Sequence, residues 1–361
     1  MKKFILKFIL ITLITFVPII SCNYFVDPAN IFHDDVVRKI IAGLSSGNIV
    51  EVSAANMDEG LLQEMMIQSM DDAPETVIIG SSHVMYIPFE YGNLHNAGMS
   101  GSWLGDYYSI VGLLKDSNKL PKRIIIGVDP WVLLRDATDG RWVTLNKYAV
   151  SLKKDIFSND NNNELRGCDI LPNVAKLKKL SSIEYFQSVL KKIRNDGFNI
   201  ERGEVGIALD SNINSKFKIV PDGRRIPAKN FFKDSPDIEK DIDIKIEQRS
   251  IYSVGKGFTE IPNKNLEEFD KLLYYLISND IEVHLYLPAW HPRVYELFSN
   301  DENYSGVLKV EEAVRKLSSK YGISVHGGYN PTSRGFKTED FMDWMHLLPD
   351  KSLVDYQSTQ N

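Results

Sequence analysis

Cysteine is scarce in this chain of 361 residues, which has only Cys22 and Cys168. Cys22 belongs to an apolar segment, so we expect no internal disulfide, and no Cys and His spacing typical of a structural zinc site occurs. Charge of one sign is not concentrated either: the formal net charge is −6, with no basic stripe and no aromatic RNA-binding motif. No internal repeat is visible. These absences argue against a disulfide scaffold, a structural zinc site and a nucleic-acid partner.

A long apolar run near the N-terminus is the first positive feature. Three lysines among the first seven residues precede the uncharged residues 8–26, and this length is close to the ~20 residues that cross a bilayer as a helix. Basic residues on this flank predict that the N-terminus stays inside and the remainder lies outside. We therefore expect residues 1–28 to be a retained membrane anchor that holds a periplasmic or cell-surface domain. Two alternatives stay open, a cleaved signal peptide and a lipoprotein lipidated at Cys22.

The rest of the chain divides into two regions. Residues 29–73 have helical spacing at 35–44 and 56–70, which predicts a helical stalk or lid. In residues 74–361 strands alternate with helices, which predicts a three-layer α/β/α domain with a mainly parallel sheet. We expect strands at 76–80, 123–128, 281–287 and 323–325, and helices at 104–115, 266–278 and 306–321.

A long insertion, about residues 140–255, interrupts this alternation. It contains a polar loop at 158–163, an apolar helical pattern at 174–194, and Pro-Asp-Gly at 221–223, which predicts a hairpin turn. Its charged stretch at 233–249 predicts a solvated helix or loop. The insertion is the natural place for substrate selection, but its sequence names no ligand.

Two short motifs at opposite ends of the domain carry the proposed chemistry. Ser82 follows the apolar run 76–79 through a turn in which Gly80 permits a sharp bend, so we expect the serine to be exposed above the sheet. Asp343 and His346 are three residues apart, a spacing that places both on one side of a helical turn. One short segment can then supply a general base and the carboxylate that orients it. Together the motifs predict Ser82 as nucleophile, His346 as base and Asp343 as its partner.

A glycine-rich block lies between these motifs. Residues 96–102, Asn-Ala-Gly-Met-Ser-Gly-Ser, precede the helix expected at 104–115. Gly98 and Gly101 let the backbone approach a bound group closely, and a helix start offers unpaired N–H groups. The block is therefore suitable for an oxyanion hole, while a strand-to-helix loop with glycines for packing is the alternative.

The order of these motifs resembles the SGNH, or GDSL-like, hydrolase superfamily. The strand with Gly-Ser-Ser, the Asn-x-Gly-x-Ser-Gly block, a strand with Gly-x-Asp at 127–129 and the late Asp-x-x-His carry the resemblance. With its N-terminal anchor the chain looks most like the membrane-anchored members associated with cell-surface polysaccharide O-acylation, and is similar to D-alanine transfer and alginate O-acetylation proteins. The resemblance implies Ser82 as nucleophile, the amides of Ser82 and Gly101 as oxyanion donors, and His346 with Asp343 as the remaining catalytic pair.

The chain departs from the superfamily pattern at two positions. The usual Gly-Asp-Ser is Gly-Ser-Ser here, with Ser81 in the middle. The third block, which normally supplies an Asn to the oxyanion hole, is Gly127-Val128-Asp129, and valine cannot donate. An ionised Asp129 would repel an oxyanion, and the loss of one oxyanion donor typically costs about 10²–10³ in rate. The sequence therefore leaves a slow transferase and an inactive relative open.

Further residues follow strand ends, where ligands bind in parallel sheets. We expect His83 to support the site or contact a substrate, and Trp131 to form an apolar or sugar-stacking wall. Arg293, in one loop with His291, either binds an anionic group or pairs with a surface acid. The full set of expected lining residues is Ser81, His83, Asn96, Asp129, Trp131, His291 and Arg293.

The sequence thus predicts an extracytoplasmic O-acyltransferase or acyl esterase that acts on cell-envelope polysaccharide esters without a metal or other cofactor. The resemblance implies a multispanning membrane acyltransferase as a partner. Two other classes stay open: a non-catalytic carbohydrate-binding or assembly factor on the same fold, and a free-standing lipase or esterase. The first requirement of the catalytic hypothesis is geometric, because His346 must lie within hydrogen-bond reach of Ser82.

Overall fold

The computed structural model describes most of the chain. The described residues are 2–28, 30–53, 57–89, 92–135, 140–158, 177, 180–197, 205–208, 215–248, 250–251 and 259–358. Several predicted features lie partly or wholly outside these ranges: most of the loop at 158–163, the first part of the helix at 174–194, the first residue of the helix at 56–70, the last residue of the charged stretch at 233–249, and Cys168.

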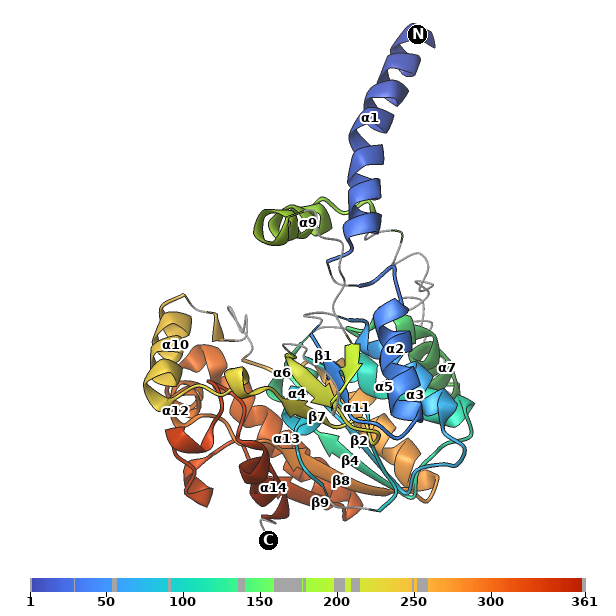
Figure 1. The fold of residues 1–361 in the computed structure, drawn as a ribbon. Coiled ribbons are helices and arrows are strands. Elements are labelled where there is room, and N and C mark those ends of the chain that lie inside the picture. The colour runs from blue at the N-terminus through green and yellow to red at the C-terminus, as the bar shows by residue number, and fades with distance from the viewer. Residues whose placement is uncertain are drawn as a thin grey trace.

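A five-stranded parallel sheet forms the centre of the fold (Figure 1). Its order is β3-β2-β4-β8-β9, and every neighbouring pair of strands is parallel. The predicted α/β class with a mainly parallel sheet is confirmed. Isoleucine and valine side chains of β2 and β4 are buried on both faces, which explains why these strands read as unbroken apolar runs. The strands are β2 (Thr76–Ile79), β3 (Leu94–Asn96), β4 (Arg123–Gly127), β8 (Glu282–Leu287) and β9 (Ser324–Gly327).

Successive side chains of the central strands enter two different cores. On one face Val77 and Ile124 pack with buried residues of α5, α11 and α13 in the main core. On the opposite face Ile78 and Ile125 pack with Val84 of α4 and with residues of α14. Both faces of the sheet are therefore covered. The helices of this domain are α4 (Ser82–Met85), α5 (Leu104–Asp116), α6 (Pro130–Leu134), α7 (Asn146–Ile156), α11 (Asn263–Ser278), α12 (Pro292–Asn300), α13 (Ser305–Tyr321) and α14 (Pro349–Gln357).

A second sheet, antiparallel and four-stranded, joins the region predicted as a stalk or lid to the insertion. Its order is β5-β1-β6-β7, so β1 lies between two strands of the insertion. The hairpin turn predicted at 221–223 is confirmed: it joins β6 to β7, and the Gly223 N–H donates to the Val220 carbonyl at 2.9 Å. The turn also meets the parallel sheet, because the Asn96 N–H donates to the Asp222 carbonyl at 2.7 Å. The strands are β1 (Val50–Val52), β5 (Val205–Ile207), β6 (Phe217–Ile219) and β7 (Arg225–Pro227).

The second sheet has its own small core. Helices α2 (Asp35–Ser45) and α3 (Glu59–Ser69) contribute apolar side chains that pack with those of β1 and β6. The methionine and leucine stripe of α3, Leu62 and Met66 among it, is buried there. The stripe is thus packing surface within this core.

The N-terminal helix α1 (Lys2–Val26) projects away from both sheets, and α9 (Ile183–Asp196) lies across its C-terminal end (Figure 1). The Asn23 side chain donates to the Leu180 carbonyl at 2.8 Å, and the Tyr185 hydroxyl donates to Asp27 at 2.6 Å. Within the described ranges, no helix combines the length and mean hydropathy required to cross a membrane. The remaining helices are α10 (Ser235–Glu247) and short 3₁₀ turns at Val143–Leu145, Lys229–Phe231, Glu302–Tyr304, Thr332–Arg334 and Thr338–Asp340.

Candidate active site

The turn after β2 presents Ser82 at the start of a short helix. Gly80 has a φ of 156°, and a Cβ atom there would lie 2.9 Å from the Val84 side chain. The Ser81 hydroxyl caps the following helix by accepting from the His83 N–H at 3.2 Å. Glycine at the bend and serine at the cap therefore place Ser82 as the first residue of α4, beyond the carboxyl end of β2.

The segment that carries Asp343 and His346 is a closed loop. An isolated β-bridge pairs Phe341 with Leu347, and the Met342 N–H donates to the His346 carbonyl at 2.9 Å. The helical turn predicted for Asp343 and His346 is wrong, because residues 341–347 are not helical. The bridge brings the ends of the loop together and gives Asp343 and His346 a common direction without a helix.

Ser82, His346 and Asp343 form an unbroken set of contacts. His346 Nε2 lies 2.7 Å from Ser82 Oγ, and His346 Nδ1 lies 2.7 Å from Asp343 Oδ2. An ionised carboxylate can only accept, so the Nδ1 atom carries a hydrogen and Nε2 of the neutral ring is left to accept the hydroxyl proton of Ser82. The geometric requirement set by the sequence is met, and the arrangement is suited to nucleophilic attack by serine.

Asp343 is held ionised by its surroundings. Burial by itself would raise the pKa of this carboxyl group, but the opposing charge and hydrogen bond of His346 and the N–H groups of Met345 and His346 lower it to about 2. Both N–H groups donate to Asp343 Oδ1 at 2.7 Å. One carboxylate oxygen thus fixes the loop, while the other orients the imidazole.

The backbone amides of Ser82 and Gly101 are the candidate oxyanion donors. Among the described residues, neither N–H donates to another protein group. The Gly98 N–H, in contrast, donates to the Asn96 side chain at 2.9 Å. The Met99 N–H donates to the Gly80 carbonyl at 3.0 Å and ties the glycine-rich loop to the nucleophile turn. The Ser82 amide at the start of α4 and the Gly101 amide in the glycine-rich loop are therefore available to a bound group, as oxyanion donors must be.

A buried ion pair that the sequence analysis missed supports this loop. The Ser100 N–H and hydroxyl donate to Glu59 of α3 at 2.6 and 2.8 Å. Arg225 of β7 pairs with the same carboxylate at 2.9 Å, and both charged side chains are buried. Gly101, the next residue, has a φ of 58°, and a Cβ atom there would collide with Arg141. No short-range pattern links Glu59, Ser100 and Arg225, so only the folded chain reveals this support.

His83 and Asp129 form a second pair of imidazole and carboxylate beside the first. His83 Nδ1 lies 2.6 Å from Asp129 Oδ1, and both side chains are almost completely buried. Burial by itself would lower the pKa of His83, but the negative charge of Asp129 and the contact with the Met345 carbonyl leave the pKa raised. Asp129, which the sequence analysis treated as a threat to an oxyanion, is thus compensated by a neighbouring imidazole.

Three of the other expected lining residues, Ser81, Asn96 and Trp131, are buried next to the site. Ser81 and Asn96 are buried and bond to backbone groups of the site loops, so they shape the site. Trp131 is buried, donates to the Ser102 carbonyl at 2.9 Å and lies edge-on to Trp290.

His291 and Arg293 face the insertion. Arg293 pairs with Glu239 and Asp243 of α10, each at 2.7 Å, which agrees with the surface-acid interpretation. His291 is buried and caps α12, and burial lowers its pKa to about 4. Among the described residues, no hydrogen bond or ion pair joins either side chain to the triad.

Aromatic residues next to His346 were not expected from the sequence. The Tyr86 ring lies edge-on to His346 with centroids 5.8 Å apart, and Phe231 of the insertion lies 6.2 Å from Tyr86. The Lys233 N–H donates to the Met342 carbonyl at 3.1 Å. The insertion therefore borders the triad, at the position from which it can select a substrate.

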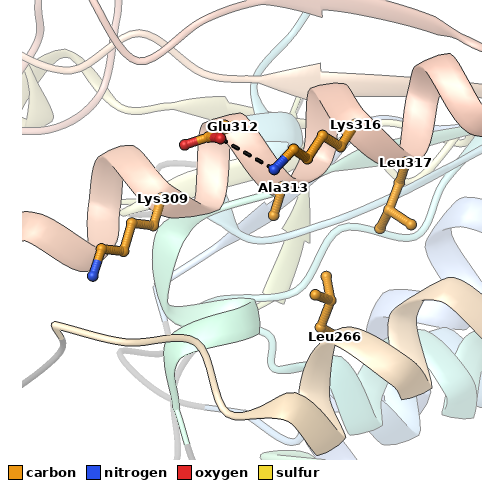
Figure 2. Close-up of a pocket in the computed structure, with 6 residues that line it drawn as sticks. All are labelled: Leu266, Lys309, Glu312, Ala313, Lys316 and Leu317. Carbon is orange, nitrogen blue, oxygen red and sulfur yellow. Dashed lines mark ion pairs between the residues drawn. The ribbon is translucent and has the colours of Figure 1, made fainter.

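A shallow pocket of ≈ 230 Å³ lies elsewhere, between α11 and α13 (Figure 2). It contains no triad residue and is lined by Leu266, Lys309, Glu312, Ala313, Lys316 and Leu317. Lys316 pairs with Glu312, one turn earlier on α13, at 3.3 Å. Five of these six side chains form the aliphatic and charged surface of one helix, α13, so we assign no role to this pocket. In the part of the chain that is described, no cluster of His, Cys, Asp and Glu could hold a metal ion.

The fold and this site define an α/β protein with a Ser-His-Asp triad at the carboxyl edge of a parallel sheet. Comparison with known protein-family models found no match to the chain, and a search of curated proteins found none either.

Proposed function

We propose that this chain is an SGNH-like serine O-acyltransferase or acyl esterase that acts on polysaccharide esters of the cell envelope. The observation that carries the proposal is the pair of 2.7 Å contacts that connect Asp343 to His346 and His346 to Ser82. Residues more than 250 positions apart in the chain come together there, with a hydrogen-bond direction suited to proton transfer from serine.

Each residue has a defined task in this mechanism. His346 removes the Ser82 proton as Oγ attacks the ester carbonyl, and Asp343 stabilises the imidazolium that forms. The amides of Ser82 and Gly101 donate to the oxyanion of the tetrahedral intermediate. His346 then returns the proton to the leaving alcohol, and an acyl-serine results. A sugar hydroxyl or water, deprotonated by His346, releases the acyl group and restores Ser82.

The location outside the cytoplasm belongs to the same proposal. Apolar side chains of α1, such as Phe4 and Ile14, are more than half exposed, and basic residues precede them. Ile183 and Leu190 of the adjoining α9 are also exposed. A membrane that receives α1 would cover this surface and would hold the catalytic domain near a multispanning acyl-donor partner, as the resemblance implies.

Acyl transfer from p-nitrophenyl acetate, followed with the full chain in detergent, tests the reaction. We expect slow release of p-nitrophenol, faster release when an envelope oligosaccharide is added, and acetyl ester on that oligosaccharide by mass spectrometry. Ser82→Ala should abolish all three. Rapid turnover that ignores the acceptor would instead indicate a free-standing esterase.

A non-catalytic carbohydrate-binding or assembly factor is the second candidate. Asp129 favours it, because this residue replaces the Asn that serves the oxyanion hole in SGNH enzymes. If this candidate is right, Ser82→Ala leaves binding of the polysaccharide and the biological role unchanged, and the wild-type chain forms no acyl-serine.

A further inference from the structure

A second imidazole and carboxylate pair lies directly behind the proposed triad. His83 Nε2 contacts the Met345 carbonyl at 3.0 Å, while His83 Nδ1 contacts Asp129 at 2.6 Å. A carbonyl oxygen can only accept, so His83 Nε2 must carry a hydrogen. The peptide unit after this carbonyl belongs to His346, whose ring lies 4.9 Å from the His83 ring. His83 thus binds the backbone that carries the proposed base.

The contacts form one continuous path to the nucleophile. Asp129 holds His83, His83 holds the Met345 carbonyl, and the Met345 N–H donates to Asp343 at 2.7 Å. Asp343 then orients His346, which contacts Ser82. Because His83 follows Ser82 directly in the chain, the path closes on itself. His83 therefore fixes the turn that carries Ser82 relative to the 341–347 loop that carries His346.

The surroundings of His83 leave it little freedom. Its ring packs edge-on against Trp290 with centroids 5.1 Å apart and lies 6.2 Å from the Trp131 ring. The charged or titratable groups that face it are Asp129 after β4, and Asp343 and His346 in the 341–347 loop. Within the described ranges, neither oxygen of Asp129 has a hydrogen bond of good geometry, so the 2.6 Å ion-pair contact with the His83 imidazole is what compensates this buried carboxylate.

We propose that His83 and Asp129 are positioning residues of the acyl-transfer site, and that they hold the His346 loop at the distance from Ser82 that proton transfer requires. The proposal rests on the proposed function. It gives Asp129 a role other than that of the superfamily Asn: Asp129 aligns His83 and makes no contact with the oxyanion. Removing a residue that orients a functional group without touching the substrate typically changes activity by about 10- to 100-fold.

The rate of inactivation by a fluorophosphonate, measured on the full chain in detergent, tests the proposal. Removing His83 alone would leave Asp129 as a bare buried charge, so the informative variant is the double substitution His83→Phe with Asp129→Leu, which removes both partners. We expect its maximal inactivation rate to fall about 10- to 100-fold, with an unchanged half-saturating concentration of reagent. The inactivation rate of Asp129→Asn should stay within about threefold of wild type. The Asn amide can donate to His83 Nδ1, and His83 Nε2 then keeps its hydrogen and still donates to the Met345 carbonyl.

Two further variants separate positioning from a general loss of structure. His83→Gln combined with Asp129→Asn supplies an amide donor for the Met345 carbonyl without leaving a bare buried charge, and should recover part of the rate lost in the His83→Phe, Asp129→Leu variant. His326→Phe removes a half-buried imidazole that bonds to the Tyr356 carbonyl, away from the triad, and should keep the wild-type rate. If the His83→Phe, Asp129→Leu variant is inactivated as fast as wild type, the positioning role is overturned. An Asp129→Asn variant as slow as the His83→Phe, Asp129→Leu variant would also overturn it. An inert wild-type chain would instead contradict the proposed function.

Discussion

At the scale of single residues, the account depends on the charge state of Asp343. Its carboxyl group is largely removed from solvent yet remains ionised, because two backbone N–H groups and the His346 ring surround it. A pKa of about 2 in the folded chain, below the ordinary value of 3.8, means that folding favours the ionised form. Ionised Asp343 therefore contributes stability above the ordinary pKa, and this contribution is lost as the pH falls from about 4 towards about 2.

The acid dependence of unfolding checks this charge state. A pKa lowered by nearly two units corresponds to about 2 kcal/mol, so the free-energy difference between wild type and Asp343→Asn should shrink by about that amount between pH 5 and pH 2. Denaturant unfolding of both proteins at several pH values measures it. Comparison with the Asn variant removes the contributions of other buried acids, such as Asp355, whose pKa is raised to about 6 by burial. A difference that does not change with pH would mean that folding does not lower the pKa of Asp343.

At the scale of secondary-structure elements, long apolar runs were predictable and short elements were not. The strands near 76–80, 123–128 and 281–287 lie within a residue or two of their predicted positions. In the first two, β-branched side chains buried on both faces leave a clear pattern. Strands β1 and β3 have only three residues each, too few to show a period, and pairing with distant partners forms them.

In the candidate site, too, some residues could be predicted from the sequence and others could not. Ser82, Asp343 and His346 could be found because each lies in a short motif, and the contacts among them agree with that selection. The Glu59 and Arg225 pair could not be found, since it joins α3 to β7 across the glycine-rich loop. The non-helical shape of the 341–347 loop was also hidden, because a bridge at its ends sets it.

The ion pair between Glu59 and Arg225 should support the glycine-rich loop from α3. Glu59→Gln removes the charge that compensates buried Arg225 and loosens Ser100, and breaking such a buried pair typically costs about 3–5 kcal/mol. We expect a lower unfolding free energy and slower fluorophosphonate inactivation. Glu75→Gln, at a solvent-exposed pair with Lys122, is the matched control and should change little. If Glu59→Gln destabilises the protein but inactivation stays at the wild-type rate, the loop does not depend on this pair.

At the scale of the whole molecule, three parts of the chain converge on one edge of the parallel sheet. The segment before β2 supplies Glu59, the insertion supplies Arg225 and Phe231, and the C-terminal loop supplies Asp343 and His346. Helix α1 projects from this assembly with α9 across its C-terminal end (Figure 1). In the proposed function, α1 and α9 form the surface that meets a membrane.

Membrane fractionation of cells that produce the full chain tests the proposed anchor. We expect the wild-type protein to stay in the membrane pellet after alkaline carbonate extraction. The double variant Leu10→Arg with Ile14→Arg should be released, because each Arg at the centre of a bilayer helix costs about 2.5–3.5 kcal/mol. Lys7→Arg, which keeps the basic flank, should remain in the pellet. Release of the wild-type protein would argue against a retained helix.

The most direct test of the central claim is to locate the covalent adduct after the full chain reacts with a fluorophosphonate. Peptide mass spectrometry should place one adduct on Ser82, none in Ser82→Ala, and one still on Ser82 in Ser81→Ala, the neighbouring serine. An intact, folded wild-type chain that carries no adduct, or carries it on another residue, would contradict the account.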